Sequence, residues 1–273
     1  MGIVNVTPDS FSDGGLYLDP ARAIAHGREL AADGADLLDV GGESTRPGAS
    51  PVGADEELRR VGPVVGALAT SEGATVSIDT SKAAVAEAAL AAGATVVNDV
   101  TALRGDPELA GVCAASGCEV VLMHMLGTPR TMQEHPRYDD VVAEVKSFLR
   151  ARIEAAVDAG IAQERISIDP GIGFGKTLAH NLELLRRLRE LRELGRPVVV
   201  GTSRKSFLGR LTGREVGDRL GGTIASSVLA LANGADILRV HDVGAARDAV
   251  ITAEAILARR TGADGAVDTL PPR

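Results

Sequence analysis

Short apolar runs recur along the chain, and each is followed by a polar side chain at its end or within two residues of it. The runs are rich in β-branched residues or leucine, which is typical of buried strands. They predict strands at 2–6, 36–40, 75–79, 95–98, 119–123, 165–169, 197–201 and 236–240. The polar residues at the ends of these runs are Asn5, Asp39, Asp79, Asn98, His124, Asp169, Ser203 and Arg239. In a barrel of parallel strands the carboxyl ends carry the chemistry, so this regularity locates a candidate active site.

Segments with the helical spacing of apolar residues lie between the predicted strands, and a similar segment follows the last strand. The clearest predicted helices are 19–33, 138–159, 179–194, 218–233 and 245–260. A degenerate repeat joins helix to strand through a glycine and an alanine, with the glycine at Gly34, Gly93 and Gly234. Glycine adopts left-handed backbone geometry without a steric penalty, so each is predicted to end a helix and turn the chain into the next strand.

The alternation of strands and helices indicates βα units with right-handed crossovers, which build a parallel sheet. Eight such units favour closure into a TIM (β/α)8 barrel, an α/β fold that we expect to form a single domain over residues 1–260. An open doubly wound sheet is the alternative, because periodicity does not show whether the first strand meets the last. The segment 261–273 lacks periodicity and is predicted to be a frayed C-terminal tail.

Composition and charge narrow the classes of function. The 29 basic and 37 acidic residues give a net charge of −8, which argues against a nucleic-acid partner. No apolar stretch reaches about 18 residues and the N-terminus lacks the features of a signal peptide, so we expect a cytoplasmic protein without a membrane partner. Cys113 and Cys118 have no partner at zinc spacing and are predicted to be reduced, packed thiols.

Several loops after the predicted strands carry candidate chemistry. The segment 41–51 is rich in Gly, Pro and Ser and contains Arg46 as its one cation. In 169–176 a glycine-rich run follows Asp169, and we expect its backbone N–H groups to approach a bound group. It is no P-loop, because Pro170 stands where that motif needs glycine, and its glycines miss the dinucleotide spacing. Arg239 and His241 are two residues apart on an extended segment, so both could grip one anion.

At nearly every strand end the chain resembles the dihydropteroate synthase family. The matching motifs are NVTPDSFSDGG (5–15), GGESTRPG (41–48), IDTSK (78–82), VNDV (97–100), LMHMLGTP (122–129), DPGIGFGK (169–176), GTSRKSFLG (201–209) and RVHDV (239–243). The resemblance covers the chain to about residue 260. It implies a TIM barrel that joins 6-hydroxymethyl-7,8-dihydropterin diphosphate to 4-aminobenzoate, releases diphosphate and uses Mg²⁺. It also implies a homodimer.

The resemblance further implies roles for individual residues. Asp79, Asn98 and Asp169 would bind the pterin edge, whose N–H groups suit carboxylate acceptors beside an amide. Arg46, Arg239 and His241 would hold the diphosphate, and Asn5 would help to position Mg²⁺. The aminobenzoate pocket would contain Phe11, Thr45, Pro47, Phe174 and Ser206. Further substrate-binding positions implied by the match are Met123, Gly201 and Ser203.

The expected catalytic residues are Lys205, Arg239, His241 and Asp13. Lys205 would lie between the two substrates, the cations would stabilise charge growing on the leaving diphosphate, and Asp13 would stabilise a pterin methylene cation. An arylamine is already a neutral nucleophile at pH 7, so no strong base is required, and His124 is interpreted as a packed strand-end histidine. Two alternative functions are a pterin- or folate-dependent methyltransferase module and a catalytically silent pterin-binding paralogue.

Overall fold

Short parallel strands form the centre of the computed structural model, which describes residues 1–7, 19–46, 48–71 and 74–257. In these ranges the strands are β1 (Gly2–Asn5), β2 (Leu37–Gly41), β3 (Thr75–Asp79), β4 (Val96–Asp99), β5 (Glu119–Met123), β6 (Ile166–Asp169), β7 (Val199–Val200) and β8 (Ile237–Leu238). All eight coincide with predicted strands. The last two are shorter than predicted, because their flanking residues pair only through isolated bridges.

Those bridges close the ring. Strands β1 to β6 form one parallel sheet in chain order, and β7 pairs with β8. Val198, just before β7, bridges to Ile168 in β6, and Val240, after β8, bridges to Gly2 in β1. The backbone N–H of Val240 also donates to the carbonyl of Met1 at 2.9 Å. The first strand therefore meets the last, which confirms the barrel and rules out an open doubly wound sheet.

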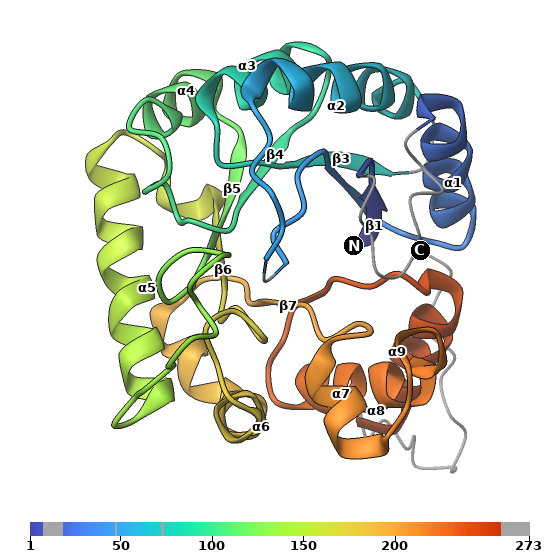
Figure 1. Cartoon of the computed structure of the whole chain (residues 1–273), viewed down its shortest axis with the longest axis vertical. Helices are drawn as coiled ribbons and strands as arrows, with labels where there is room; N and C mark the ends of the chain where they lie inside the picture. Colours follow the sequence, from blue (N-terminus) through green and yellow to red (C-terminus); the bar gives the residue numbers. More distant parts are fainter. Residues whose placement is uncertain (8–18, 47, 72–73, 258–273) are drawn as a thin grey trace, which may run out of the picture.

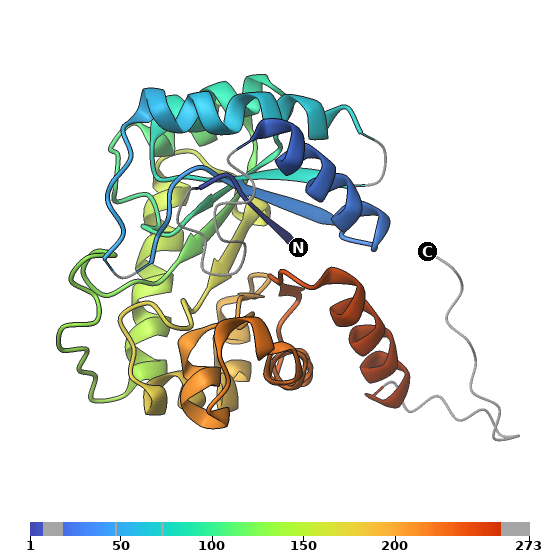
Figure 2. The same ribbon diagram turned by 45° about the vertical axis from the view of Figure 1, so that its right-hand side comes forward.

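Helices surround the strands and follow one another round the ring in chain order (Figure 1). They are α1 (Pro20–Ala32), α2 (Ala54–Ala69), α3 (Ala83–Ala91), α4 (Leu109–Ser116), α5 (Val141–Asp158), α6 (Leu178–Arg186), α7 (Ser206–Thr212), α8 (Leu220–Ala232) and α9 (Val243–Leu257). Short 3-10 helices lie at η1 (Gln163–Arg165), η2 (Leu188–Leu194) and η3 (Val216–Asp218). The turned view in Figure 2 shows the strands enclosed between the first four helices and the last three. In the described ranges, no helix is long and apolar enough to cross a membrane.

Local chemistry explains where several helices begin and end. Asp19 caps α1 by accepting from the N–H of Ala21 at 3.0 Å. Gly34, Gly93 and Gly234 have φ of 93°, 108° and 106°, so the prediction that glycine turns the chain at these three junctions is confirmed.

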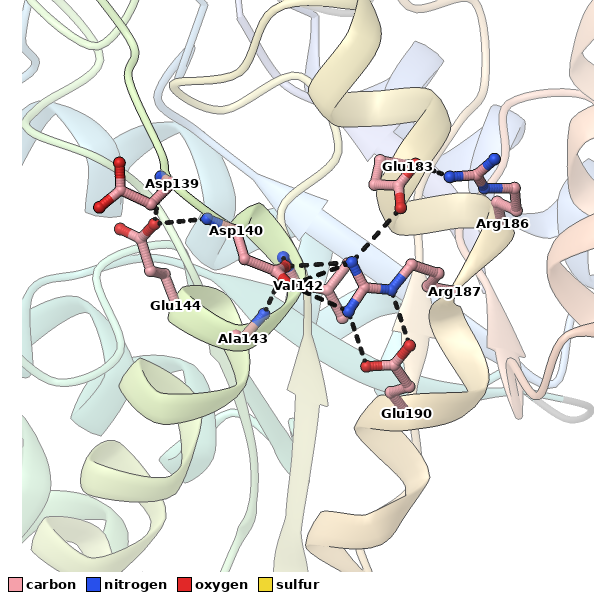
Figure 3. Close-up of polar contacts among 9 residues, drawn as sticks. All are labelled: Asp139, Asp140, Val142, Ala143, Glu144, Glu183, Arg186, Arg187 and Glu190. Carbon is pink, nitrogen blue, oxygen red and sulfur yellow. Dashed lines mark hydrogen bonds and ion pairs between the residues drawn. The ribbon is translucent and has the colours of Figure 1, made fainter.

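The predicted helix 179–194 divides into α6 and η2 at Arg187, whose backbone leaves the helical region with φ −102° and ψ 19°. At this break the Arg187 guanidinium donates to the carboxylates of Asp140, Glu183 and Glu190 (Figure 3). Asp140 also caps α5 by accepting from the N–H groups of Val142 and Ala143. One surface network therefore ties the start of α5 to the junction of α6 and η2.

Apolar side chains fill the space between strands and helices, and a separate small cluster fills the barrel itself. That inner cluster consists of buried Met1, Val96, Val121 and Val199, with Leu37 and Ile237 packed against it. Most of these residues stand at or before the start of a strand, so apolar groups close the amino-terminal end of the barrel. The polar side chains that end the strands lie at the opposite, carboxyl-terminal end of the barrel. Cys113 and Cys118 are buried free thiols near α4, as predicted.

Candidate active site

A buried carboxylate, Asp39, organises the polar cluster at the carboxyl ends of four strands. Its Oδ1 accepts from Ser77 Oγ at 2.7 Å, and its Oδ2 accepts from Asn98 Nδ2 at 3.0 Å and from Arg239 Nε at 2.6 Å. These partners come from β3, β4 and the segment after β8. The strand-end pattern includes Asp39, but sequence reasoning gave it no role. Here it fixes the orientation of two predicted site residues, Asn98 and Arg239.

Asp79, at the end of β3, shares the same guanidinium. Arg239 Nη2 donates to its Oδ2 at 2.9 Å. Burial and then the charge of Asp39 raise the pKa of Asp79, and Arg239 opposes the rise. Two acids therefore share one cation, so the ligand-free cluster carries an excess of acid that a ligand with N–H donors could satisfy.

Asp169 ends β6 and is 7% exposed. Its Oδ1 accepts from the N–H of Gly171 at 2.6 Å. Burial raises its pKa, while the charges of Lys205 and Arg239 oppose the rise. Since Arg239 acts electrostatically on both Asp79 and Asp169, the acids predicted to bind pterin and the cation predicted to bind the anion lie at one end of the barrel.

The glycine-rich segment after Asp169 adopts positive φ at Gly171, Gly173 and Gly175. From the sequence we expected the N–H groups of this segment to approach a bound ligand, but three of them bind the protein itself. Gly171 donates to Asp169, Gly173 donates to Asn181 Oδ1 at 2.7 Å, and Phe174 donates to the carbonyl of Gly171. For these three amides the expectation is wrong, because the loop uses them to hold its own shape.

Lys205 precedes α7, and Ser206 begins that helix on its exposed side. The Lys205 ammonium donates to the carbonyl of Ile172 and lies 4.9 Å from the centre of the Phe174 ring. Burial lowers its pKa to about 8. The lysine therefore joins the loop after β7 to the loop after β6.

His241 follows β8, and its Nδ1 lies 2.9 Å from Ser203 Oγ. Burial, followed by the charges of Arg204, Arg239 and Arg46, lowers its pKa to about 3. The imidazole is therefore neutral among guanidinium groups, and an arriving anion would be attracted to this position. The same interaction indicates that Arg46 lies near His241.

Arg46 and Thr45 lie half-buried in the loop between β2 and α2. Glu43 anchors this loop, because it accepts from the N–H of Val52 at 3.1 Å and from the Lys82 ammonium. Lys82 also donates to Glu57, which is fully buried and whose Oε1 has no partner among the described residues. Sequence reasoning did not detect this cluster, since its members are distant in the chain.

The remaining predicted residues divide into three groups. Asn5 ends β1 and is half-buried. Met123 is buried at the end of β5 in a cluster with Phe174, and a Cβ at Gly201 would lie 3.6 Å from Lys205 Nζ. Three predicted residues, Phe11, Asp13 and Pro47, lie outside the described ranges.

Among the described residues, no group of three or more His, Cys, Asp or Glu could hold a metal ion.

His124 is buried against the edge of the Phe148 ring, with ring centres 4.8 Å apart, as expected for a packed histidine. Its Nδ1 lies 2.9 Å from the ammonium of Lys176, which is 3% exposed. Burial, and then the repulsion from Lys205, lower the pKa of Lys176 to about 7, while Asp169 opposes this. The motif at 169–176 includes Lys176, but sequence reasoning gave it no role, because its burial depends on the fold of the glycine-rich loop.

Comparison with known proteins gives the family of the chain. The family model for pterin binding enzymes matches residues 1–241. The chain belongs to this family. It is 46% identical to the dihydropteroate synthase of Escherichia coli K12 over 260 residues, which cover 95% of this chain and 92% of the relative. It is 49% identical to that of Mycobacterium leprae over 257 residues, covering 92% and 90% of the two chains.

Solved structures of the pterin binding enzyme family agree with the barrel. A Yersinia pestis dihydropteroate synthase with a sulfonamide drug complex aligns with a TM-score of 0.92 at 46% identity, covering 94% of each chain. The Xanthomonas albilineans enzyme with 4-aminobenzoic acid aligns with a TM-score of 0.88 at 53% identity, covering 94% of this chain and 92% of that one. The fold and family implied by the sequence motifs are thus confirmed.

Proposed function

We propose that the protein is a transferase that joins 6-hydroxymethyl-7,8-dihydropterin diphosphate to 4-aminobenzoate and releases diphosphate, a step of folate biosynthesis. The observation that carries the proposal is the convergence of buried acids with Arg239, His241 and Lys205 at one end of the barrel. The relatives named above are dihydropteroate synthases, and a Xanthomonas albilineans structure contains 7,8-dihydropteroate.

Asp79, Asn98 and Asp169 are the residues that we assign to the pterin. The heterocycle presents N–H donors and a carbonyl, which match carboxylate acceptors beside an amide. Burial raises the pKa of both acids, so a ligand that donates to them relieves an electrostatic cost. A ligand without these donors would leave the acids unpaired, at roughly 1–3 kcal/mol for each group. Met123 supplies an apolar wall.

Arg46, Arg239 and His241 are assigned to the diphosphate. Arg239 uses Nε and Nη2 for the two acids, so Nη1 is the nitrogen that we assign to the anion. The neutral His241 donates one hydrogen bond and becomes more basic when the anion arrives. As the bond between the pterin methylene and the diphosphate oxygen breaks, these fixed groups stabilise the charge that grows on that oxygen.

Mg²⁺ is proposed as the cofactor, with Asn5 as its protein ligand. The donor set fits, because Mg²⁺ keeps several waters and takes few protein oxygens when substrate phosphates bind it. Asn5 offers one such oxygen at the end of β1, at the carboxyl-end rim where the cluster lies. When bound, the ion would supply further positive charge to the leaving diphosphate.

The aminobenzoate is assigned to the mouth between the loops after β2, β6 and β7, with Phe174 and Lys205 on one side and Thr45 on the other. Ser206 would donate to its carboxylate. Other proposed members are Phe11, Pro47, Gly201 and Ser203. The amine nitrogen attacks the methylene carbon with its lone pair and then loses a proton to solvent, so no strong base is needed, and Asp13 is proposed to stabilise the methylene cation.

The protein is also proposed to be a cytoplasmic homodimer. Large apolar side chains exposed on α8 and α9 support an interface: Leu229 is 61% exposed, Ile251 is 51% exposed and Ile256 is 72% exposed. The buried free thiols of Cys113 and Cys118 are consistent with a reducing compartment.

Turnover tests the proposed reaction. Diphosphate should be released only when the pterin diphosphate and 4-aminobenzoate are both present. A methyltransferase module would release none, and a silent paralogue would bind ligands without turnover. Calorimetry tests the residue assignments: Asp169→Asn should abolish binding of free hydroxymethylpterin, and Arg46→Ala should weaken the diphosphate ester far more than the free pterin. Equal losses for both ligands in Arg46→Ala would contradict the anion assignment.

A further inference from the structure

Side chains from two other parts of the chain, together with its own Lys176, hold the glycine-rich loop, defined here as residues 170–176. Its four consecutive carbonyls from residue 172 to residue 175 each accept a hydrogen bond from a side chain. The donors are Lys205 Nζ to Ile172, Gln133 Nε2 to Gly173 at 2.6 Å, Lys176 Nζ to Phe174 at 2.9 Å and Tyr138 Oη to Gly175 at 2.9 Å. Two of the donors belong to the loop between β5 and α5, so that loop braces the glycine-rich loop.

The two loops also approach each other too closely for a side chain. A Cβ at Gly171 would lie 1.9 Å from the carbonyl oxygen of His124, and a Cβ at Gly175 would lie 2.6 Å from Leu126 Cβ. Both glycines have positive φ. The path of the glycine-rich loop is therefore set by its contact with residues 124–126, and the hydrogen bonds hold it against that surface.

Lys176 and Tyr138 are the best-fixed donors. Lys176 is buried between the carbonyl of Phe174, to which it donates, and Nδ1 of His124, both 2.9 Å from its Nζ. The ring of Tyr138 meets the edge of the His180 ring, with centres 5.0 Å apart. The proposed mechanism uses neither side chain, although each binds the carbonyl of Phe174 or of its neighbour.

We propose that Lys176 and Tyr138 are positioning residues that hold the Phe174-bearing loop in the shape that receives the 4-aminobenzoate ring. The proposal rests on the proposed function. The Phe174 ring lies 4.9 Å from Lys205 Nζ, and its own carbonyl is one of the braced four, so displacement of the loop would move one wall of the aminobenzoate site. Asp79 and Asn98, which are assigned to the pterin, lie on β3 and β4 and bond to Arg239 and Asp39 rather than to the brace. The third pterin residue, Asp169, accepts from Gly171, which precedes the four braced carbonyls.

The experiment compares Lys176→Met and Tyr138→Phe with the unaltered enzyme and with a control, Thr128→Val. Thr128 lies in the same loop as Tyr138, but its hydroxyl contacts Thr131 rather than the glycine-rich loop. Three quantities are measured: KM for 4-aminobenzoate, kcat, and Kd for hydroxymethylpterin by calorimetry. Tyr138→Phe removes one hydroxyl and nothing else, so it remains informative if Lys176→Met fails to fold.

Lys176→Met and Tyr138→Phe should each raise KM for 4-aminobenzoate roughly two- to tenfold, which is the effect of losing one hydrogen bond, with the larger rise for Lys176→Met. KM should not change in the control Thr128→Val. The Kd for hydroxymethylpterin should rise by a smaller factor than KM, because the braced carbonyls follow Gly171, the loop residue that donates to Asp169. Lys176→Arg should recover part of the loss. Hydrogen exchange at residues 171–175 should be faster in both variants and unchanged in Thr128→Val.

Unchanged KM in the folded variants would overturn the proposal, as would equal rises in KM and in the pterin Kd. These results differ from failure of the proposed function, which would appear first as absence of aminobenzoate-dependent diphosphate release by the unaltered enzyme. That absence would overturn the positioning roles as well.

Discussion

Replacement of Asp79 by asparagine should stabilise the ligand-free protein and weaken pterin binding at the same time. Asp39 and Asp79 share the single guanidinium of Arg239, and the side chains of the two acids are 0% and 13% exposed. Burial and then Asp39 raise the pKa of Asp79 to about 8, against the opposing charge of Arg239. The amide in Asp79→Asn keeps an acceptor for Arg239 but cannot ionise, so it never places a second negative charge beside Asp39.

The magnitude follows from the pKa. Folding must keep this carboxyl protonated up to about pH 8, whereas an ordinary aspartate ionises near 3.9, and the difference corresponds to a cost of at most about 5 kcal/mol at pH 8. The charge of Arg239 already lowers this pKa, so its effect is contained in that figure. The neutral amide should therefore gain up to about 5 kcal/mol at pH 8 but only about 1–2 kcal/mol at pH 5, with roughly 2–4 °C in Tm for each kcal/mol in a protein of this size.

The sign of the pH dependence follows from the same shift. An acid whose pKa is higher in the folded protein than in the unfolded chain does not affect the free energy of unfolding below its unfolded pKa. As the pH rises from the unfolded pKa toward the folded pKa, the free energy of unfolding falls. The unaltered protein should therefore lose stability between about pH 4 and pH 8 at this site. The variant lacks the titrating group, so its advantage in Tm should be largest near pH 8 and should shrink toward pH 5.

Thermal unfolding of both proteins at pH 5, 6.5 and 8 measures this difference. Glu193→Gln is a matched control, because Glu193 forms one exposed ion pair with Lys146 and should change Tm little at any of these pH values. In the same samples, Kd for hydroxymethylpterin should rise roughly ten- to a hundredfold, since the amide NH2 replaces one of the two carboxyl oxygens that could accept from the pterin. A lower Tm for Asp79→Asn at pH 8, or an advantage independent of pH, would refute the reasoning.

Two further substitutions test the loops around the site by thermal unfolding. Lys82→Met should lower stability by about 3–5 kcal/mol, because it leaves buried Glu57 without its counter-charge, and a loss below about 1 kcal/mol would contradict this. Gly171→Ala should lose stability and pterin affinity, since its Cβ would lie 1.9 Å from the His124 carbonyl at φ 67°. Gly111→Ala, in open space within α4, should be neutral or stabilising, and equal effects of the two alanines would refute the steric argument.

The strands and the rim of the barrel could be predicted from sequence because both depend on local patterns. A short apolar run predicts a strand, and the polar residue that ends it must lie at the carboxyl end once the strands are parallel. Asp79, Asn98, Asp169 and Arg239 all follow this rule. The glycine turns at helix ends are equally local, since each depends on one residue with positive φ.

The pairing of these side chains could not be predicted from sequence. Arg239 contacts Asp39 across 200 residues and Asp79 across 160, and no pattern in the chain specifies which acid a distant arginine will meet. The burial of Lys176 against His124 has the same origin. The amides of the glycine-rich loop were misjudged for another reason: glycine spacing predicts an unusual backbone but does not show whether its N–H groups face a ligand or the loop itself.

The position of Arg239 joins the two halves of the proposed site. Its Nε donates to Asp39 and its Nη2 donates to Asp79, which is assigned to the pterin. Burial and the charge of Arg204, followed by that of Arg239, lower the pKa of His241, which is assigned to the diphosphate. A pterin that donates to Asp79 satisfies a carboxyl group that, among the described residues, otherwise depends on Arg239 alone. A diphosphate beside His241 attracts the same guanidinium. A ligand carrying both groups therefore relieves both electrostatic costs at once, which neither free pterin nor free diphosphate can do. On this argument the affinity for the pterin diphosphate should exceed what the two separate fragments suggest, because one buried cation serves both.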